Sequence, residues 1–170
     1  MNAPASHSLP AIAIPERMLT FGLGGEHFAI DAQCVREIME VPAITRVPGA
    51  PAFADGLLNV RGAIVPLADL AIVFGMERAA HNADTRIIVI EAAVEEEAAT
   101  IGILADKVFD VASLDGAPVE SPPQVGMKWR TDFIIGIARH AGRFVILPDL
   151  PRIFTECVGQ IHRAAPHLPA

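Results

Sequence analysis

The chain has 170 residues, of which 52% are hydrophobic and 19% are charged, and its formal net charge at pH 7 is −7. This composition is typical of a globular protein, and with one Trp and no Tyr the core is expected to be mainly aliphatic. The negative charge and the scattered positions of the thirteen basic residues argue against binding to a nucleic-acid backbone.

The cysteine pattern, the lengths of the apolar runs and the start of the sequence all indicate a cytoplasmic protein. Cys34 and Cys157 form no metal-binding or disulfide pattern, which suits a reducing environment. No apolar run approaches the roughly 18 residues of a membrane span, and the chain does not begin with a secretory signal. We therefore expect a cytoplasmic protein.

In chain order, residues 1–17 are rich in Pro and Ala without periodicity, so we expect a flexible tail. Apolar and β-branched residues then predict strands, with helix as an alternative only for the third. These segments are 18–23, 27–30, 35–41, 86–90, 100–104 and 108–114. Between them, the Glu-rich segment 91–99 predicts a solvent-exposed loop at a hairpin tip, and 118–126 a Pro-rich loop.

A hairpin is predicted over residues 56–70, with its tight turn at Arg61 and Gly62. Pro66 lies in the second strand, which predicts an edge or bulge position because proline has no N–H to donate. The same pattern returns over 136–150, shifted by 80 residues from Gly56 to Gly136. We interpret the chain as two related modules in tandem.

Each hairpin is followed by an aspartate that can cap a helix. Asp69 precedes a short predicted helix ending at Gly75, and Asp149 repeats this arrangement. The last residues, 156–170, are expected to form a C-terminal tail.

The predicted fold is therefore all-β. About five strands per module indicate small barrels or a sandwich, the first over 18–85 and the second over 86–155, with a short helix after each second hairpin. Because a barrel of this size is marginally stable alone, the two should pack on a shared apolar layer. Whether they exchange strands is left open.

A search for catalytic chemistry finds no nucleophile elbow, phosphate-binding loop or zinc motif. Asp31, Asp69, Asp106 and Asp149 all lie at strand or helix ends, where turn chemistry explains them. We therefore expect no catalytic residue, no metal and no cofactor, and the protein is not expected to be an enzyme.

Several strings together resemble the chemotaxis coupling protein family, CheW-like, over about residues 18–155. They are Val35-x-Glu37-Ile38, Thr45-x-x-Val-Pro48, Gly56-x-x-Asn59-x-Arg61-Gly62-x-Ile64-Val65-Pro66, Asp69-Leu70, Gly102-x-Leu104-x-Asp106-x-Val108 and Phe133-x-x-Gly136. The resemblance implies two intertwined five-stranded SH3-like barrels. It also implies an adaptor, monomeric alone and assembling in arrays, that joins the regulatory domain of a CheA-type histidine kinase to the cytoplasmic tip of methyl-accepting chemoreceptors at the inner face of the membrane.

By the same resemblance, five residues match the receptor-facing groove: Val35, Glu37, Ile38, Asn59 and Arg61. Our hypothesis is that Arg61 and Glu37 form a bidentate pair that fixes the groove wall, while Val35 and Ile38 offer apolar contact to a receptor helix. The alternative is that these residues are structural. The kinase contact is expected on the second module, at residues that the sequence does not identify.

Three other functions stay open at this point. A CheW-like paralogue could serve surface motility or another chemosensory output. A small-ligand module would use the groove between the barrels, where Asn59, Arg61 and Arg139 are the polar groups available. A nucleic-acid-binding barrel is disfavoured by the negative charge and the shortage of aromatic residues.

Overall fold

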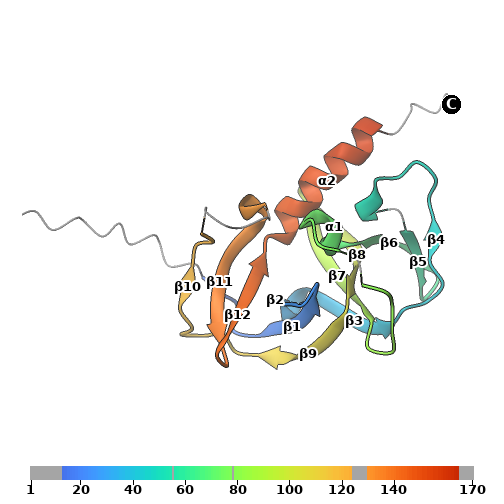
Figure 1. Cartoon of the computed structure of the whole chain (residues 1–170). Helices are drawn as coiled ribbons and strands as arrows, with labels where there is room; N and C mark the ends of the chain where they lie inside the picture. The colour runs from blue at the N-terminus through green and yellow to red at the C-terminus, as the bar shows by residue number, and fades with distance from the viewer. Residues whose placement is uncertain (1–12, 55, 78, 124–129, 165–170) are drawn as a thin grey trace, which may run out of the picture.

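The structure is a computed structural model that describes residues 13–54, 56–77, 79–123 and 130–164, with side chains up to residue 157 (Figure 1). Three expectations fall wholly or partly outside these residues: the tail before residue 13, the end of the Pro-rich loop, and the last residues of the chain. The strands are β1 (Met18–Leu23), β2 (Glu26–Asp31), β3 (Val35–Glu40), β4 (Thr45–Arg46), β5 (Gly56–Val60), β6 (Ala63–Ala68), β7 (Arg86–Val94), β8 (Glu97–Ala105), β9 (Lys107–Ala112), β10 (Val119–Glu120), β11 (Ile134–His140) and β12 (Arg143–Pro148). The helices are α1 (Leu70–Val73) and α2 (Leu150–Ala164), with 3-10 turns η1 (Ala32–Cys34), η2 (Ala52–Ala54) and η3 (Thr131–Phe133).

The strands form two six-stranded sheets of matching order, β4-β5-β6-β8-β7-β3 and β10-β11-β12-β2-β1-β9. Each sheet contains one parallel pair, β6 with β8 and β12 with β2, and all its other pairs are antiparallel. The expectation of two small intertwined barrels is confirmed. Each barrel has five longer strands and a sixth strand of only two residues, β4 or β10.

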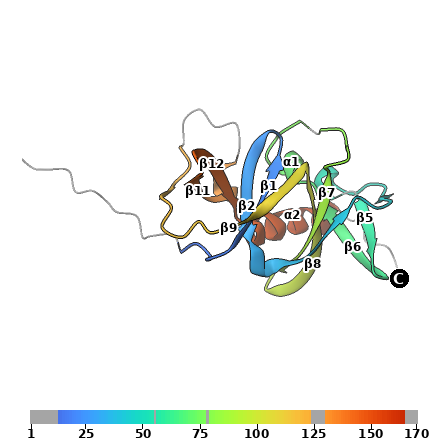
Figure 2. The same ribbon diagram turned by 90° about the horizontal axis from the view of Figure 1, so that it is seen from below.

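The barrels are not contiguous in sequence. The β1–β2 hairpin joins β9–β12 to form what we call the second barrel, while the β7–β8 hairpin joins β3–β6 to form the first barrel. The boundary expected at residue 85 therefore does not separate them, and the strand exchange left open by the sequence is present. Figures 1 and 2 show the β11–β12 hairpin on one side of the molecule, β5 and β6 on the other, and the exchanged hairpins between.

The exchanged hairpins are buried on both faces, which explains their nearly continuous apolar sequences. In β7, Ile87 and Val89 face the interior of the first barrel, whereas Ile88 and Ile90 face an apolar layer between the barrels. We call this the shared layer. Its residues from the two hairpins are Leu19, Phe21, Leu23, Phe28, Ile30, Ile88, Ile90, Ile101, Ile103 and Ala105.

Structural equivalences confirm the repeat at 80 residues. The turn residues Arg61 and Ala141 occupy the same place in the two hairpins, and both have left-handed backbone angles, with φ of 52° and 50°. The aspartates repeat as well, because the Asp69 N–H donates to the Phe53 carbonyl at 2.7 Å and the Asp149 N–H to the Phe133 carbonyl at 2.8 Å.

Two strand-level expectations are wrong. β6 lies inside its sheet, so Pro66 does not mark an edge; it is tolerated because the ladder to β8 begins one residue later, at Leu67. The expected loop 91–99 is mostly strand, since β7 and β8 pair from Ile90 to a two-residue turn at Glu95 and Glu96. The glutamates still form an exposed tip, as predicted.

The second helix is longer than its counterpart. Asp149 Oδ1 accepts the Arg152 N–H at its start, as Asp69 Oδ1 accepts the Ala71 N–H in α1, but α2 has 15 residues against four. The segment expected as a tail from residue 156 is therefore helical through Ala164, and Cys157 is buried. No described helix is both long and apolar enough to span a membrane.

Because each half supplies a hairpin to the other half's barrel, we expect neither residues 1–85 nor residues 86–170 to fold alone. Each fragment would leave a double-sided apolar hairpin without its partner strands. Mixing or co-expressing the two should restore native circular dichroism and a cooperative thermal transition. A cooperative transition in either isolated fragment would contradict the exchanged topology.

Gly102 is expected to be intolerant of substitution, because a Cβ there would lie 2.9 Å from Leu58 and 3.1 Å from Ile87 inside the first barrel. Gly102→Ala should cost about 1–3 kcal/mol of unfolding free energy by overpacking. Gly22→Ala is the matched control, since its Cβ would meet the half-exposed Phe109 ring, which can move. Urea denaturation measures both, and equal losses would contradict the packing argument.

Candidate functional site

The candidate site begins at β3, which lies at the edge of its sheet and, among the described strands, pairs with β7 alone. A β-bulge between Val35 and Glu37 shifts the register, so that Val35 pairs with Ile90 and Ile38 with Ile88. Paired residues project from the same face of a sheet, and Ile88 and Ile90 both face the shared layer. The bulge therefore places Val35 and Ile38 on one face, although their spacing in the sequence would put them on opposite faces of a regular strand.

Burial separates the roles of these two side chains. Val35 is half-buried and packs against the shared layer, so part of it belongs to the core. Ile38 is 42% exposed at the margin of the same layer. Together they extend the apolar layer to the protein surface.

Glu37 pairs with Val89 and so points toward the interior of the first barrel. The Arg61 Nε–H donates to Glu37 Oε2 at 3.0 Å, with the two side chains 82% and 28% exposed. This contact joins β3 to the β5–β6 turn across the barrel mouth. The hypothesised pair forms through a single hydrogen bond in place of the bidentate one, and its exposure implies a contribution of only about 0–1 kcal/mol.

Asn59 has a local structural partner. Its Oδ1 accepts the N–H of Gly62 at 2.9 Å, which stabilises the turn that contains Arg61. Of the five predicted residues, the structure thus brings Glu37 and Arg61 into contact and sets Val35 and Ile38 side by side on one face, while Asn59 supports the turn.

Sequence reasoning missed the counterpart of this surface on β9. Val108 pairs with Phe21 and Val111 with Leu19, again across a bulge, so both face the shared layer. Val111 is 46% exposed and the bulged Phe109 is 42% exposed. The signal was available, because the echo between the strings around Val35 and Val108 is visible in the sequence.

A further contact on β3 was also missed. Arg36, at the bulge, forms an ion pair with Glu91 of β7, and both side chains are exposed. Glu91 was expected to be part of a loop, so no partner for Arg36 was foreseen. The pair lies on the surface beside the predicted residues.

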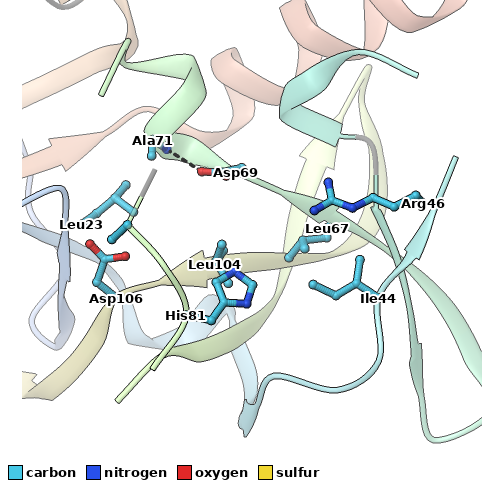
Figure 3. A pocket seen from close by; sticks show the side chains of 10 residues that line it. Leu23, Ile44, Arg46, Leu67, Asp69, Ala71, His81, Leu104 and Asp106 are labelled. Carbon is cyan, nitrogen blue, oxygen red and sulfur yellow. Dashed lines mark hydrogen bonds between the residues drawn. The ribbon is translucent and has the colours of Figure 1, made fainter. Parts of the chain in front are cut away.

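A separate pocket lies beside α1 and the end of β8 (Figure 3). Its polar residues include Asp69 and Asp106, which accept the backbone N–H groups of Ala71 and Gly24 at 3.0 and 2.9 Å. The cavity volume is about 40 Å³, whereas small-molecule sites need roughly 300 Å³ or more. Nothing in this pocket favours the small-ligand hypothesis. Among the described residues, no three His, Cys, Asp or Glu side chains gather as a metal site would require.

The ion-pair network with altered pKa values has a structural role. The Arg130 guanidinium hydrogen-bonds Asp132 and lowers the pKa of that carboxyl, while Asp132 and Glu156 raise the pKa of Arg130. Arg130 also lies 4.0 Å over the Phe133 ring. These contacts fasten η3 to α2, and all the charged groups are solvent-exposed.

Comparisons with known proteins agree with the geometry. The family model described as the CheW-like domain matches residues 17–158. The chain belongs to the CheW-like family. It is 30% identical over 143 residues to "Chemotaxis protein CheW" of Klebsiella aerogenes, covering 84% of each chain, and 29% identical over 140 residues to the protein of that name in Treponema pallidum, covering 82% of each.

A solved CheW-like structure shows the same fold. The scaffolding protein TtCheW from Thermoanaerobacter tengcongensis superposes with a TM-score of 0.72 at 30% identity, covering 87% of this chain and 93% of that one. A shorter match, 32% identity over 89 residues, is to "Protein PilI" of Pseudomonas aeruginosa, covering 52% of this chain and 48% of that protein. The CheW-like family is a family of chemotaxis adaptors, and the two-barrel fold is shared with it.

The contribution of the Glu37–Arg61 contact to the unfolding free energy can be measured, and the internal repeat provides a control substitution. Arg61→Gly and Ala141→Gly replace equivalent residues with similar positive φ, so both relieve the same backbone strain. In urea denaturation, Arg61→Gly should be less stable than Ala141→Gly by no more than about 1 kcal/mol, because only the exposed ion pair differs. A loss of about 3–5 kcal/mol, as for a broken buried pair, would show that Arg61 is structural.

Proposed function

We propose that this chain is a non-enzymatic adaptor that couples the cytoplasmic tip of methyl-accepting chemoreceptors to the regulatory domain of a CheA-type histidine kinase. Membership of the CheW-like family supports the general role. The proposed receptor contact is supported by the bulged strand β3. There the exposed Ile38 and the half-buried Val35 extend the shared layer to the protein surface.

The receptor contact is proposed to lie where the shared layer meets the surface. Val35 and Ile38 of β3 border the layer from the first barrel, and Val108 and Val111 of β9 border it from the second. An amphipathic receptor helix would place its apolar side chains on such a surface. The Glu37–Arg61 contact then holds β3 in place and offers an exposed guanidinium to polar groups at the helix edge.

The kinase contact is proposed to lie on the second barrel. The exposed Phe144 at the tip of the β11–β12 hairpin, 60% exposed with the Arg139 guanidinium 5.1 Å from its ring, is an apolar group available there. Phe144 lies on β12 of one sheet and β3 belongs to the other sheet, so one adaptor could hold both partners.

Weak contacts suffice for such an adaptor. Micromolar affinity corresponds to about 8 kcal/mol for each contact, and repeated copies in an array multiply the effect. The chain would then be monomeric when isolated, and receptors would recruit it to the inner face of the membrane.

A second candidate is an adaptor of the same kind that serves another chemosensory output, such as surface motility. A relative that is not named as a chemotaxis protein, "Protein PilI", matches part of the chain, which makes this the runner-up. The same contacts would operate in this case, with a different receptor and kinase.

Binding measurements with substitutions at β3 and its supporting turn test the receptor site. Ile38→Ala removes the exposed apolar side chain, and Arg61→Gly removes the guanidinium; each should weaken binding to a receptor cytoplasmic fragment about tenfold, or about 1.4 kcal/mol. Both variants should still bind the kinase regulatory domain with unchanged affinity. Ala141→Gly, the matched turn control, should bind both partners like the unmodified chain.

Isothermal calorimetry against each purified partner from the same genome gives the comparison. Receptor affinity unaltered by both Ile38→Ala and Arg61→Gly, in proteins that remain folded, would rule out β3 as the contact. Failure of the unmodified chain to bind either partner would direct attention to a second chemosensory kinase in that genome.

A further inference from the structure

One end of the second barrel, where β2, β9 and β12 begin, carries a group of basic and aromatic side chains. Cross-strand pairing aligns His27 of β2 with Val145 of β12 and with Gly22 of β1. Gly22 is aligned in turn with Lys107 of β9. Because Val145 belongs to the core inside the second barrel, this row projects from the inner face of the sheet.

The hairpin of β11 and β12 adds two more side chains to this inner face. Arg143 lies two residues before Val145 in β12, and it pairs with His140 at the end of β11. We call this end of the barrel the basic mouth. It is formed by side chains that are exposed or half-buried, those of His27, Lys107, Phe109, His140 and Arg143.

Three side chains of the basic mouth are in direct contact. The rings of His27 and Phe109 are stacked, with their centroids 4.6 Å apart and 9° between their planes. Nη1 of Arg143 lies 3.2 Å from Nε2 of His27. Since a guanidinium can only donate hydrogen bonds, Nε2 is the acceptor in this contact. The contacts join β9, β2 and β12, and they hold a ring that is 42% exposed.

Gly22 leaves the space that the stack needs. β1 lies between β2 and β9 in the sheet, so the Phe109 ring must pass over β1 to reach His27. A Cβ on Gly22 would lie only 3.2 Å from Cζ of Phe109. A side chain at position 22 would therefore crowd the ring, and glycine in a strand is typical of such a close approach.

The first barrel has an ion pair at the equivalent place. There the bulge residue Arg36 of β3 forms an ion pair with Glu91 of β7. The matching bulge on β9 puts Phe109 at the place of Arg36, and Gly22 stands at the place of Glu91. The second barrel thus has an aromatic ring and no carboxylate where the first has two opposite charges.

The cations of the basic mouth have no ion-pair partner among the described residues. Arg143 contacts an imidazole in place of a carboxylate, and Lys107 forms no salt bridge in the part of the chain that the structure covers. The carboxylate of Asp110 on β9 already accepts a hydrogen bond from a buried hydroxyl of β1 at 2.7 Å. Glu26 precedes His27, so its side chain projects from the opposite face of β2. In a chain with a net charge of −7, this end of the barrel is locally positive.

We propose that the basic mouth is a docking surface for an acidic segment of a partner protein. Arg143 and Lys107 supply the positive charge, and the Phe109 ring supplies an apolar contact for a side chain next to the partner's carboxylate. Arginine and aromatic residues contribute most to protein interfaces, and a ring that is already held by stacking loses little freedom on binding. Recognition of an anionic membrane uses clusters of roughly four to eight Lys or Arg residues, so the peptide segment is the occupant that fits. This inference goes beyond the proposed receptor and kinase contacts and does not depend on them.

Nuclear magnetic resonance of the ¹⁵N-labelled full-length chain tests the docking surface. The probes are two synthetic peptides, acetyl-Leu-Glu-Leu-Glu-amide and its uncharged counterpart acetyl-Leu-Gln-Leu-Gln-amide. The acidic peptide should shift the amide signals of Gly22, His27 and Arg143, and it should bind about tenfold more tightly than the uncharged one. Added salt should weaken its binding, because exposed charges are screened.

Substitutions assign the binding to the basic mouth. Arg143→Gln and Phe109→Ala should each weaken binding of the acidic peptide about tenfold. Arg17→Gln is the matched control, because it also removes one exposed positive charge but lies at the opposite end of β1. It should leave the affinity unchanged. Dispersed amide spectra show that each variant is folded.

Three outcomes would overturn the proposal. The first is the absence of shifts with the acidic peptide, or equal affinity for the two peptides. The second is an equal loss of affinity in Arg143→Gln and Arg17→Gln. The third is Arg143-dependent binding to vesicles of phosphatidylserine and phosphatidylcholine in equal parts by a chain that does not bind the acidic peptide, which would assign the surface to a membrane.

Discussion

The structure depends on two hairpins that are apolar on both faces. Neither β1–β2 nor β7–β8 can lie at the protein surface, because both faces of each hairpin are apolar and both must be buried. On the face toward the shared layer the buried side chains include Phe21, Phe28, Ile88 and Ile103. The parallel pairs β6–β8 and β12–β2 meet this need by inserting each hairpin into the sheet made by the other half of the chain. The shared layer is the product of that exchange, and the hydrophobic effect across it holds the barrels together.

The candidate site follows from the same constraint. The chain crosses between barrels after β2 and again after β8, and the strands that begin at these crossings are β3 and β9. Both border the shared layer, and in both a bulge turns two apolar residues toward it. Core packing therefore positions the exposed apolar side chains of β3 and β9 where the two barrels meet. The ion pair between Arg61 and Glu37 adds an exposed contact at the open end of the first barrel.

Much of this was predictable from residue patterns, and the misses have physical reasons. The repeat, the turns at Arg61 and Ala141 and the caps at Asp69 and Asp149 are local features, so the sequence contains them. Which strand each hairpin pairs with is not a local property. The pairing of Leu67 with Gly102 depends on tertiary packing, which a short stretch of sequence does not reveal. The Glu-rich strands around Glu95 were missed because Glu and Ala are poor strand formers, and tertiary pairing overrode that preference. The groove hypothesis required Val35 and Ile38 to contact one receptor helix, and the bulge on β3, which places them on one face, could not be read from the sequence. The turn bond from the Gly62 N–H to Asn59 was not foreseen either, and the binding roles of these residues stay predictions.

The exchanged hairpins give the single chain the topology of a swapped dimer. Two copies of a single module of about this half-length, each lending its first hairpin to the other, would form a symmetric swapped dimer. Joining the end of α1 in one copy to the start of the hairpin in the next would give the present topology without moving any strand. The two halves of the chain differ at equivalent places: Glu37 contacts Arg61 in one barrel, whereas in the other Asp110 accepts a hydrogen bond from Thr20 at 2.7 Å and Ala141 stands at the place of Arg61. A single chain with two such modules can therefore present two different faces where a symmetric dimer would present two identical ones.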